Sequence, residues 1–303
     1  MNIAVIGGSG FIGSHVVDKL LIDGHDVTVF DIMKPLQPNV RHVYFDILDL
    51  QKVVIALTGE YDAIYLLAAM ANVNDVYNNP VEAGNLNIIG VANVLEAIRK
   101  NKLGRLIFAS TVWVYSLARE RNVDENTLLD MTQVDHVYTG TKIAAELYIQ
   151  SYSKLYGLEY TILRYGIPYG PRARAGTVLL NFTRNALNDK PMTIQGDGKA
   201  YRKFLYVEDL AAGNVAALNP KAKNQIINLE GMREVSIKEV AETVQSYVPN
   251  SEISFIDARP GDYEGKTVSN SKSKELMDWE PKVDFHEGAG KFIEWYKEAI
   301  HNK

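Results

Sequence analysis

A glycine-rich turn at residues 7–15, GGSGFIGSH, constrains the fold of this chain more than any other segment. Its glycines are spaced G-x-x-G-x-x-G, between an apolar run at 2–6 that is typical of a β-strand and a helical pattern at 11–23. Glycine permits the sharp turn and lets backbone N–H groups and the helix N-terminus approach a pyrophosphate. The residues expected to bind a dinucleotide here are Gly7, Gly10, Phe11, Ile12 and Gly13.

The first half of the chain alternates short β-branched runs with helical patterns. The expected strands span 2–6, 26–31, 42–45, 62–67, 104–110 and 159–165. The expected helices span 11–23, 49–57, 80–101 and 136–157. This alternation predicts an α/β fold, a Rossmann-type doubly wound parallel sheet with helices on both faces and right-handed crossovers.

Asp31 ends the second expected strand. An acid at this place in a Rossmann fold accepts hydrogen bonds from the ribose hydroxyls of adenosine. Its carboxylate would repel a 2′-phosphate, so the sequence favours NAD over NADP as the cofactor. Without a dinucleotide, the same residues would form a tight turn followed by an ordinary surface aspartate.

The pattern changes after residue 170, where helical stretches alternate with isolated strands. The expected helices there span 177–189, 207–218, 236–247 and 285–301, and the expected strands span 192–194, 204–206, 225–229 and 252–256. We predict an NAD-binding domain at 1–170 and a smaller α/β substrate-binding domain at 171–303, with some elements returning to the first domain.

Tyr138 and Lys142 are spaced Y-x-x-x-K in the expected helix 136–157, so both lie on one face. A phenol with an ordinary pKa near ~10 is a poor base at neutral pH. A nearby ammonium and the positive nicotinamide of NAD would favour the phenolate and lower that pKa. Thr111, at the end of the expected strand 104–110, is placed to hydrogen-bond the same substrate oxygen. The alternative for Tyr138 is an ordinary surface tyrosine.

Composition excludes several other classes of protein. A net charge of −5 provides no basic field for nucleic acid or an anionic membrane. No apolar run is long enough to span a bilayer, and no basic segment precedes the apolar start as in a signal peptide. The absence of cysteine excludes disulfides and thiolate chemistry and is consistent with a cytoplasmic location. The histidines follow no metal-ligand spacing, so no metal is expected.

Six motifs in order along the chain resemble the extended short-chain dehydrogenase/reductases, the NAD-dependent epimerase/dehydratase group that contains UDP-glucose 4-epimerase. They are GGSGFIGSH (7–15), STVWVYS (110–116), YTGTKIAAE (138–146), LRYGIPYGPR (163–172), GDGKAYRKFLYVEDL (196–210) and RPGD (259–262). The resemblance implies that Tyr138 is the base that takes the proton from the sugar 4-hydroxyl, assisted by Thr111, and that Lys142 also binds the nicotinamide ribose.

The resemblance also implies further contacts. The additional cofactor-binding residues that it implies are Asp46, Ile47, Leu67, Ala68, Ala69, Asn87 and Tyr165. The substrate-binding residues that it implies, besides Thr111 and Tyr138, are Trp113, Thr177, Val178, Gln195, Arg202 and Arg259. The two arginines suit the diphosphate of a nucleotide sugar, because a guanidinium can bind phosphate oxygens in a bidentate manner.

Some residues depart from the family pattern. Val112 and Trp113 stand where family members that are 4,6-dehydratases or decarboxylases often carry acids, and neither can transfer a proton. Ile167 replaces an asparagine that contacts substrate phosphates in many epimerases. Lys266 falls near a position that lines the sugar pocket, where a cation would favour an acidic sugar.

Within this family, a nucleotide-diphosphate-sugar 4-epimerase with tightly bound NAD and a transient 4-keto intermediate is the expected function. The alternatives are a sugar-nucleotide oxidoreductase or dehydratase, and a regulator that senses nucleotides without turnover. The expected helices 80–101 and 136–157 carry apolar stripes, and such a pair often forms the dimer interface in this family, so the resemblance implies a homodimer.

Overall fold

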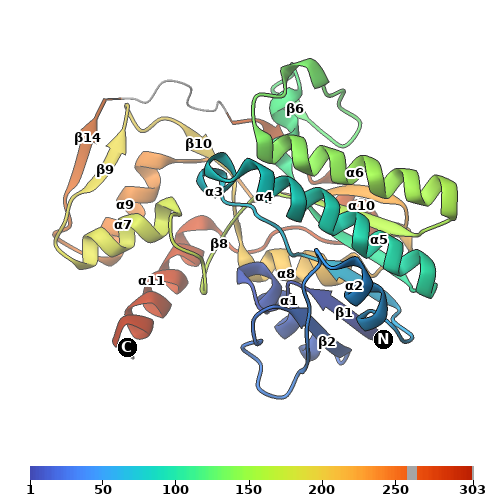
Figure 1. The fold of residues 1–303 in the computed structure, drawn as a ribbon. Coiled ribbons are helices and arrows are strands. Elements are labelled where there is room, and N and C mark those ends of the chain that lie inside the picture. The colour runs from blue at the N-terminus through green and yellow to red at the C-terminus, as the bar shows by residue number, and fades with distance from the viewer. Residues whose placement is uncertain (258–264, 302–303) are drawn as a thin grey trace.

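A seven-stranded sheet forms the centre of the computed structural model, which describes residues 1–257 and 265–301. Its strands are β1 (Asn2–Ile6), β2 (Asp26–Asp31), β3 (Arg41–Tyr44), β4 (Ala63–Leu66), β5 (Arg105–Thr111), β7 (Tyr160–Tyr165) and β12 (Gln225–Leu229). They lie in the order β12-β7-β5-β4-β1-β2-β3, and every neighbouring pair is parallel (Figure 1). The predicted doubly wound parallel sheet is confirmed.

Helices cover both faces of this sheet, as the apolar character of its central strands requires. The helices on one face are α1 (Phe11–Ile22), α8 (Val207–Ala216) and α10 (Ser271–Met277), which share a core with the strands. The helices on the other face are α2 (Leu50–Ala56), α5 (Gly90–Asn101) and α6 (Val137–Tyr156). Both faces are therefore buried, which leaves the carboxyl ends of the strands for ligands.

The expected helix 80–101 is divided in the structure. It consists of α4 (Pro80–Gly84), a π-helical turn at Asn85–Ile89 and then α5. The wide turn contains Asn87, whose buried side chain bonds the backbone of Met70 after β4. π-turns are frequent at functional sites, and this one directs Asn87 to the strand ends.

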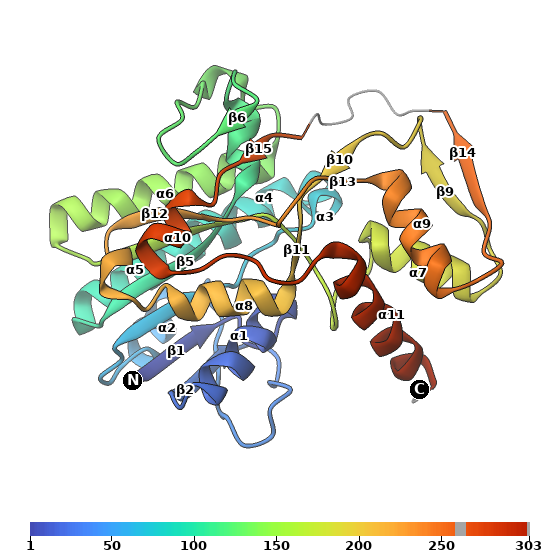
Figure 2. The same cartoon turned by 180° about the vertical axis from the view of Figure 1, so that it is seen from behind.

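The second domain packs around its own core beside the sheet (Figure 2). Its helices are α7 (Val178–Leu187), α9 (Ile237–Tyr247) and α11 (Phe285–His301). Its strand pairs are β9 (Met192–Gln195) with β14 (Ile253–Ile256), and β10 (Tyr201–Arg202) with β13 (Val235–Ser236). After residue 170 the chain also returns to the first sheet, because β12, α8 and α10 lie with it.

Several short elements carry no sequence pattern long enough to reveal them. The helix α3 (Val73–Asn78) precedes α4. The strand β6 (Asn122–Val123) pairs with β15 (Thr267–Val268), and β8 (Ile167–Tyr169) pairs with β11 (Phe204–Tyr206), which has the bounds of the strand expected there. Hydrophobic periodicity does not identify β6, β8 or β15, which have only two or three residues each.

Candidate active site

The glycine turn after β1 is packed so closely that side chains are excluded at two of its positions. Gly7 has φ +85°, and a Cβ there would lie 2.5 Å from the backbone nitrogen of Ala68. A Cβ on Gly13 would lie 2.1 Å from the carbonyl oxygen of Gly7. Gly10 caps α1 without a side chain, which leaves the first N–H groups of the helix for an anionic ligand. This cradle fits a dinucleotide pyrophosphate.

Two substitutions in this turn should have different effects. Gly13→Ala should lower the free energy of unfolding by about 1–3 kcal/mol because its methyl group overlaps backbone. Gly10→Ala should leave stability nearly unchanged, since its Cβ would lie 3.4 Å from its nearest neighbour. Urea denaturation of the two variants without cofactor measures the difference, and equal losses would contradict this account of the turn.

The adenosine side of the cradle contains the predicted acid. Asp31, half-buried at the end of β2, accepts hydrogen bonds from the backbone N–H groups of Ser9 and Met33, both at 2.9 Å. These bonds fix the carboxylate beside the glycine turn, where ribose hydroxyls would reach it. Asp46 is exposed and Ile47 is buried. Asn93 holds this segment by donating to the carbonyl oxygen of Ile47 at 2.8 Å.

The other predicted cofactor contacts lie at the ends of β4 and β7. Leu67, Ala68 and Ala69 follow β4 and are partly buried. Asn87 does not present a free amide, because it also donates to the hydroxyl of Thr141 at 3.1 Å, so its role here is to position the strand end. The phenol of Tyr165 donates to Asn214 at 2.5 Å within the core, which leaves only its main chain at the sheet edge.

Tyr138 lies in the first turn of α6 and is almost fully buried, with 8% of its surface exposed. Burial raises the pKa of Tyr138 to about 12, although the side chain of Thr111 and the charge of Arg174 act to lower it. The Thr111 oxygen accepts a hydrogen bond from the N–H of Trp113 at 3.2 Å.

Lys142 lies one turn further along α6, and its ammonium donates to the carbonyl oxygen of Ala109 at 2.8 Å. Burial lowers the pKa of Lys142 to about 8, and the Glu146 carboxylate opposes this shift. Burial dominates the pKa of the phenol, so the predicted shift towards the working range needs the positive nicotinamide as well as Lys142. A bound oxidised nicotinamide would supply the missing positive charge and accept a hydride.

A buried ion pair joins α6 to the central sheet. Arg164, on β7, donates to Glu146 through Nε at 3.0 Å and Nη2 at 2.7 Å. Ser110 donates to the same carboxylate at 2.5 Å, and the Arg164 Nη1 donates to the hydroxyl of Tyr115. The pair thus joins α6 to β5 and β7 at the level of Lys142.

The predicted substrate contacts are spread over both domains. Trp113 is half-buried, with its ring centroid 5.8 Å from that of His136, which caps α6. Thr177 and Val178 begin α7. Arg202 donates to the carbonyl oxygen of Tyr201 at 2.7 Å, and Arg259 lies outside the described residues.

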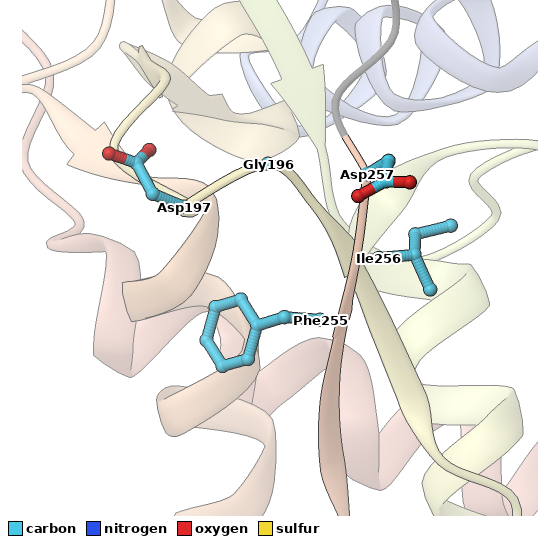
Figure 3. Close-up of a pocket in the computed structure, with 5 residues that line it drawn as sticks. All are labelled: Gly196, Asp197, Phe255, Ile256 and Asp257. Carbon is cyan, nitrogen blue, oxygen red and sulfur yellow. The ribbon is translucent and has the colours of Figure 1, made fainter.

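Gln195 ends β9 beside an open hollow of about 590 Å³ (Figure 3). The residues lining this hollow are Gly196, Asp197, Phe255, Ile256 and Asp257. The side chains of Phe255 and Asp197 lie on one side of the strand pair, and that of Ile256 points away (Figure 3). This hollow does not include Tyr138.

The sequence patterns identified neither Arg174 nor Glu230, and they gave no protein partner for Lys266. Arg174 acts on the Tyr138 phenol, and Glu230 fills the space beside Gly166, where a Cβ would lie within 2.8 Å of its carboxyl carbon. The sequence feature that could have identified Arg174 is its place two residues after Arg172, where the chain enters the second domain. Lys266 is directed to the carbonyl oxygens of Ala118 and Glu120 at 2.8 and 3.0 Å, so its ammonium is held by the 118–120 segment.

Glu230 should make stability depend on pH. Burial raises the pKa of its carboxyl from 4.5 to about 8, so the folded chain binds a proton that the unfolded chain has lost. Wild-type stability should therefore fall as pH rises from about 4.5 to about 8, by on the order of 4 kcal/mol relative to Glu230→Gln. Urea denaturation at several pH values measures this difference, with the exposed Glu275→Gln as control. A constant difference between wild type and Glu230→Gln would contradict it.

Residues 1–257 and 265–301 contain no group of three or more histidine, aspartate or glutamate side chains arranged to bind a metal. No helix within the same ranges has the length and apolar character needed to cross a bilayer.

Comparison with known proteins is consistent with this geometry. The profile of the NAD dependent epimerase/dehydratase family matches residues 3–229. A putative UDP-glucose 4-epimerase of Methanocaldococcus jannaschii is 33% identical over 97% of this chain and 98% of its own length. UDP-glucuronic acid decarboxylase 1 of Xenopus tropicalis is 32% identical over 100% of this chain and 73% of its own length.

A solved structure is also similar to this chain over nearly its whole length. The UDP-glucuronic acid 4-epimerase of Bacillus cereus, in complex with UDP-glucuronic acid and NAD, superimposes with a TM-score of 0.87 and 29% identity. The superposition covers 99% of this chain and 100% of that one. NAD, the cofactor predicted from the glycine turn and Asp31, is confirmed. The chain belongs to the NAD dependent epimerase/dehydratase family.

Proposed function

We propose that this protein is a UDP-sugar 4-epimerase that oxidises the sugar at C4 to a transient ketone and reduces it again on the opposite face. The observation that carries the proposal is the grouping of Tyr138 and Lys142 at the start of α6, which Lys142 joins to β5 through the Ala109 carbonyl, with Thr111 at the carboxyl end of the same strand. The similarity to UDP-sugar 4-epimerases over nearly the whole chain supports the nucleotide and the reaction class.

Each residue has a role that follows from its position. Tyr138 would accept the proton of the sugar 4-hydroxyl and later return it, while Thr111 holds the same oxygen through its hydroxyl. Lys142, fixed on the Ala109 carbonyl, would bind the nicotinamide ribose and add positive charge near the phenolate. NAD held by the glycine turn and Asp31 would supply the hydride acceptor.

The residues after Thr111 favour epimerisation over decarboxylation or dehydration. Val112 is buried, and Trp113 packs against His136. Neither side chain can transfer a proton to or from the sugar. With no acid at either position, these residues cannot assist loss of water after oxidation at C4, which favours return of the hydride.

The test is incubation of the purified protein with a panel of UDP-sugars, neutral and acidic, without added cofactor. We expect interconversion of a 4-epimeric pair, such as UDP-glucose and UDP-galactose or the corresponding uronic acids, detected by nuclear magnetic resonance. Failure with the whole panel would refute the epimerase. Release of carbon dioxide, accumulation of a ketone or consumption of added NADH would assign the protein to another activity of the family.

The proposed active form is a homodimer joined through α5 and α6, which run side by side on the outside of the sheet (Figure 1). Leu147, Tyr148 and Leu155 share one face of α6 and are 55%, 46% and 72% exposed. Light scattering at micromolar concentration should give twice the chain mass, and Leu147→Glu with Leu155→Glu should halve it. A wild-type monomer would contradict the dimer.

A further inference from the structure

Glu230 is a buried acid at the end of the central sheet that the proposed mechanism does not use. It directly follows β12 and is 4% exposed. Its Oε1 accepts a hydrogen bond from the N–H of Gly231 at 2.9 Å. The side chain of Asn270 accepts from the Glu230 N–H at 2.9 Å and donates to the Glu230 carbonyl oxygen at 2.8 Å. The carboxyl group therefore has a fixed position at the edge of the sheet where ligands bind.

The strand register places this carboxyl group over the end of β7. Leu229, Tyr165 and Thr111 are partners in one row across β12, β7 and β5. The N–H of Gly166 continues the ladder by donating to the carbonyl oxygen of Leu229 at 2.8 Å. A Cβ on Gly166 would lie 2.8 Å from the carboxyl carbon of Glu230. Because neighbouring strands are about 4.8 Å apart, the carboxyl group lies about one strand spacing from the strand that ends in Thr111.

The carboxyl group also lies on the face of the sheet that α6 covers. Side chains alternate between the two faces of a strand, so residue 166 shares its face with Arg164, whose guanidinium binds Glu146 of α6. Since α6 connects the parallel strands β5 and β7, it runs opposite to them, and its first turn, with Tyr138, lies at their carboxyl ends. Glu230 and Tyr138 therefore border the same corner of the candidate active site.

The acid is uncharged for the most part at neutral pH. Burial raises the pKa of Glu230 to about 8, although the N–H of Gly231 and the charge of Lys203 act to lower it. The Lys203 ammonium is directed to the carbonyl oxygen of Val268 at 3.1 Å. Within residues 1–257 and 265–301, the carboxyl group is hydrogen-bonded through Oε1 only, so its second oxygen carries an O–H that can be donated.

A carboxylic acid at this place suits an uncharged sugar. A hydroxyl group can both donate to and accept from such an acid. A sugar carboxylate at the same place would bring a second acid into a buried space, where two carboxylates oppose each other's ionisation. The arrangement therefore favours a hexose over a uronic acid.

We propose that Glu230 is a specificity-determining residue of the sugar site, whose carboxyl group forms a hydrogen bond with a hydroxyl group of an uncharged hexose held at Tyr138 and Thr111. The proposal deepens the proposed function and rests on it for the location of the sugar. Because Glu230 contacts the sugar and not the nucleotide, it should change the affinity for a UDP-sugar without changing the affinity for UDP.

Three variants separate this contact from a structural role. Glu230→Met keeps a side chain of similar length but removes the hydrogen bond. Glu230→Gln keeps both the shape and the hydrogen-bonding groups. Glu275→Met, at an exposed position of α10, is the control for the substitution itself.

The first measurement is calorimetric binding of UDP-glucose and of UDP to the NAD-loaded protein. Glu230→Met should bind UDP-glucose about threefold to tenfold more weakly than wild type, the effect of one lost hydrogen bond. It should bind UDP with wild-type affinity, and Glu230→Gln and Glu275→Met should bind both ligands as wild type does. An equal loss for UDP and UDP-glucose in Glu230→Met, or no loss for UDP-glucose, would overturn the proposal.

The second measurement adds UDP-glucuronic acid to the same series. The wild type should bind it more weakly than UDP-glucose, and Glu230→Gln should reduce this preference because the second acid is gone. A wild type that prefers UDP-glucuronic acid, or a preference that Glu230→Gln leaves unchanged, would overturn the choice of an uncharged hexose. Neither measurement needs turnover, so failure of the epimerase assay would refute the proposed function while these affinities still decide the role of Glu230.

Discussion

Tyr138→Phe should lower kcat by about 10²–10⁴-fold, the range measured for loss of a general acid–base group. The ring occupies a buried position packed with Val76 and Ala83, and phenylalanine preserves this packing. Only the hydroxyl, the proposed proton acceptor, is lost. The variant should therefore fold normally and retain its NAD while losing turnover.

The measurement compares kcat, NAD content and thermal unfolding of Tyr138→Phe with those of Tyr148→Phe. Tyr148 lies on the same helix, on the face of the proposed dimer, and phenylalanine keeps its ring there, so its variant should behave as wild type. A Tyr138→Phe enzyme with more than about a tenth of the wild-type kcat would show that another group takes the proton. Loss of NAD together with activity would instead indicate a structural role for the hydroxyl.

Arg164→Met should destabilise the protein by about 3–5 kcal/mol, because it leaves the buried Glu146 carboxylate without its partner. The Arg164 and Glu146 side chains are only 6% and 5% exposed, and their contact is bidentate. The lost pair also joins α6, with its catalytic residues, to the sheet. Activity should fall along with stability.

Urea denaturation of Arg164→Met and Arg99→Met tests this prediction. Arg99 makes a similar pair with Glu96 at 2.7 Å on the surface of α5, and exposed pairs contribute about 0–1 kcal/mol. The double variant Arg164→Met with Glu146→Leu should recover part of the loss, since it removes the unpaired charge. Equal destabilisation by the two arginine variants would contradict the prediction that the buried pair contributes more to stability than the exposed one.

Much of the fold was predictable because its signals are local and periodic. The strand–turn–helix unit at the glycine turn and the alternation of strands and helices determine a doubly wound sheet, and Asp31 lies where that unit predicts. The π-helical turn at Asn85–Ile89 was not predictable. Its widening depends on a tertiary contact, the bonds of Asn87 to Met70, which no helical periodicity encodes.

The candidate site was predictable in its residue types but not in its electrostatics. The Y-x-x-x-K spacing identifies Tyr138 and Lys142, yet burial sets their pKa values, and burial depends on how α6 packs against β5. Arg174 follows a left-handed Arg172, a conformation that composition does not reveal. Glu230 was missed because the space for its carboxyl is provided by Gly166, which lies between β7 and β8.

The most direct test of the mechanism follows the hydrogen at C4 of the sugar. A UDP-sugar that carries deuterium at C4 is incubated with the NAD-loaded enzyme in ordinary water, and the 4-epimer is analysed by mass spectrometry and nuclear magnetic resonance. If Tyr138 removes the proton while the same NAD stores and returns the hydride, the product keeps its deuterium at C4. Loss of that deuterium to water or to added cofactor would contradict the account.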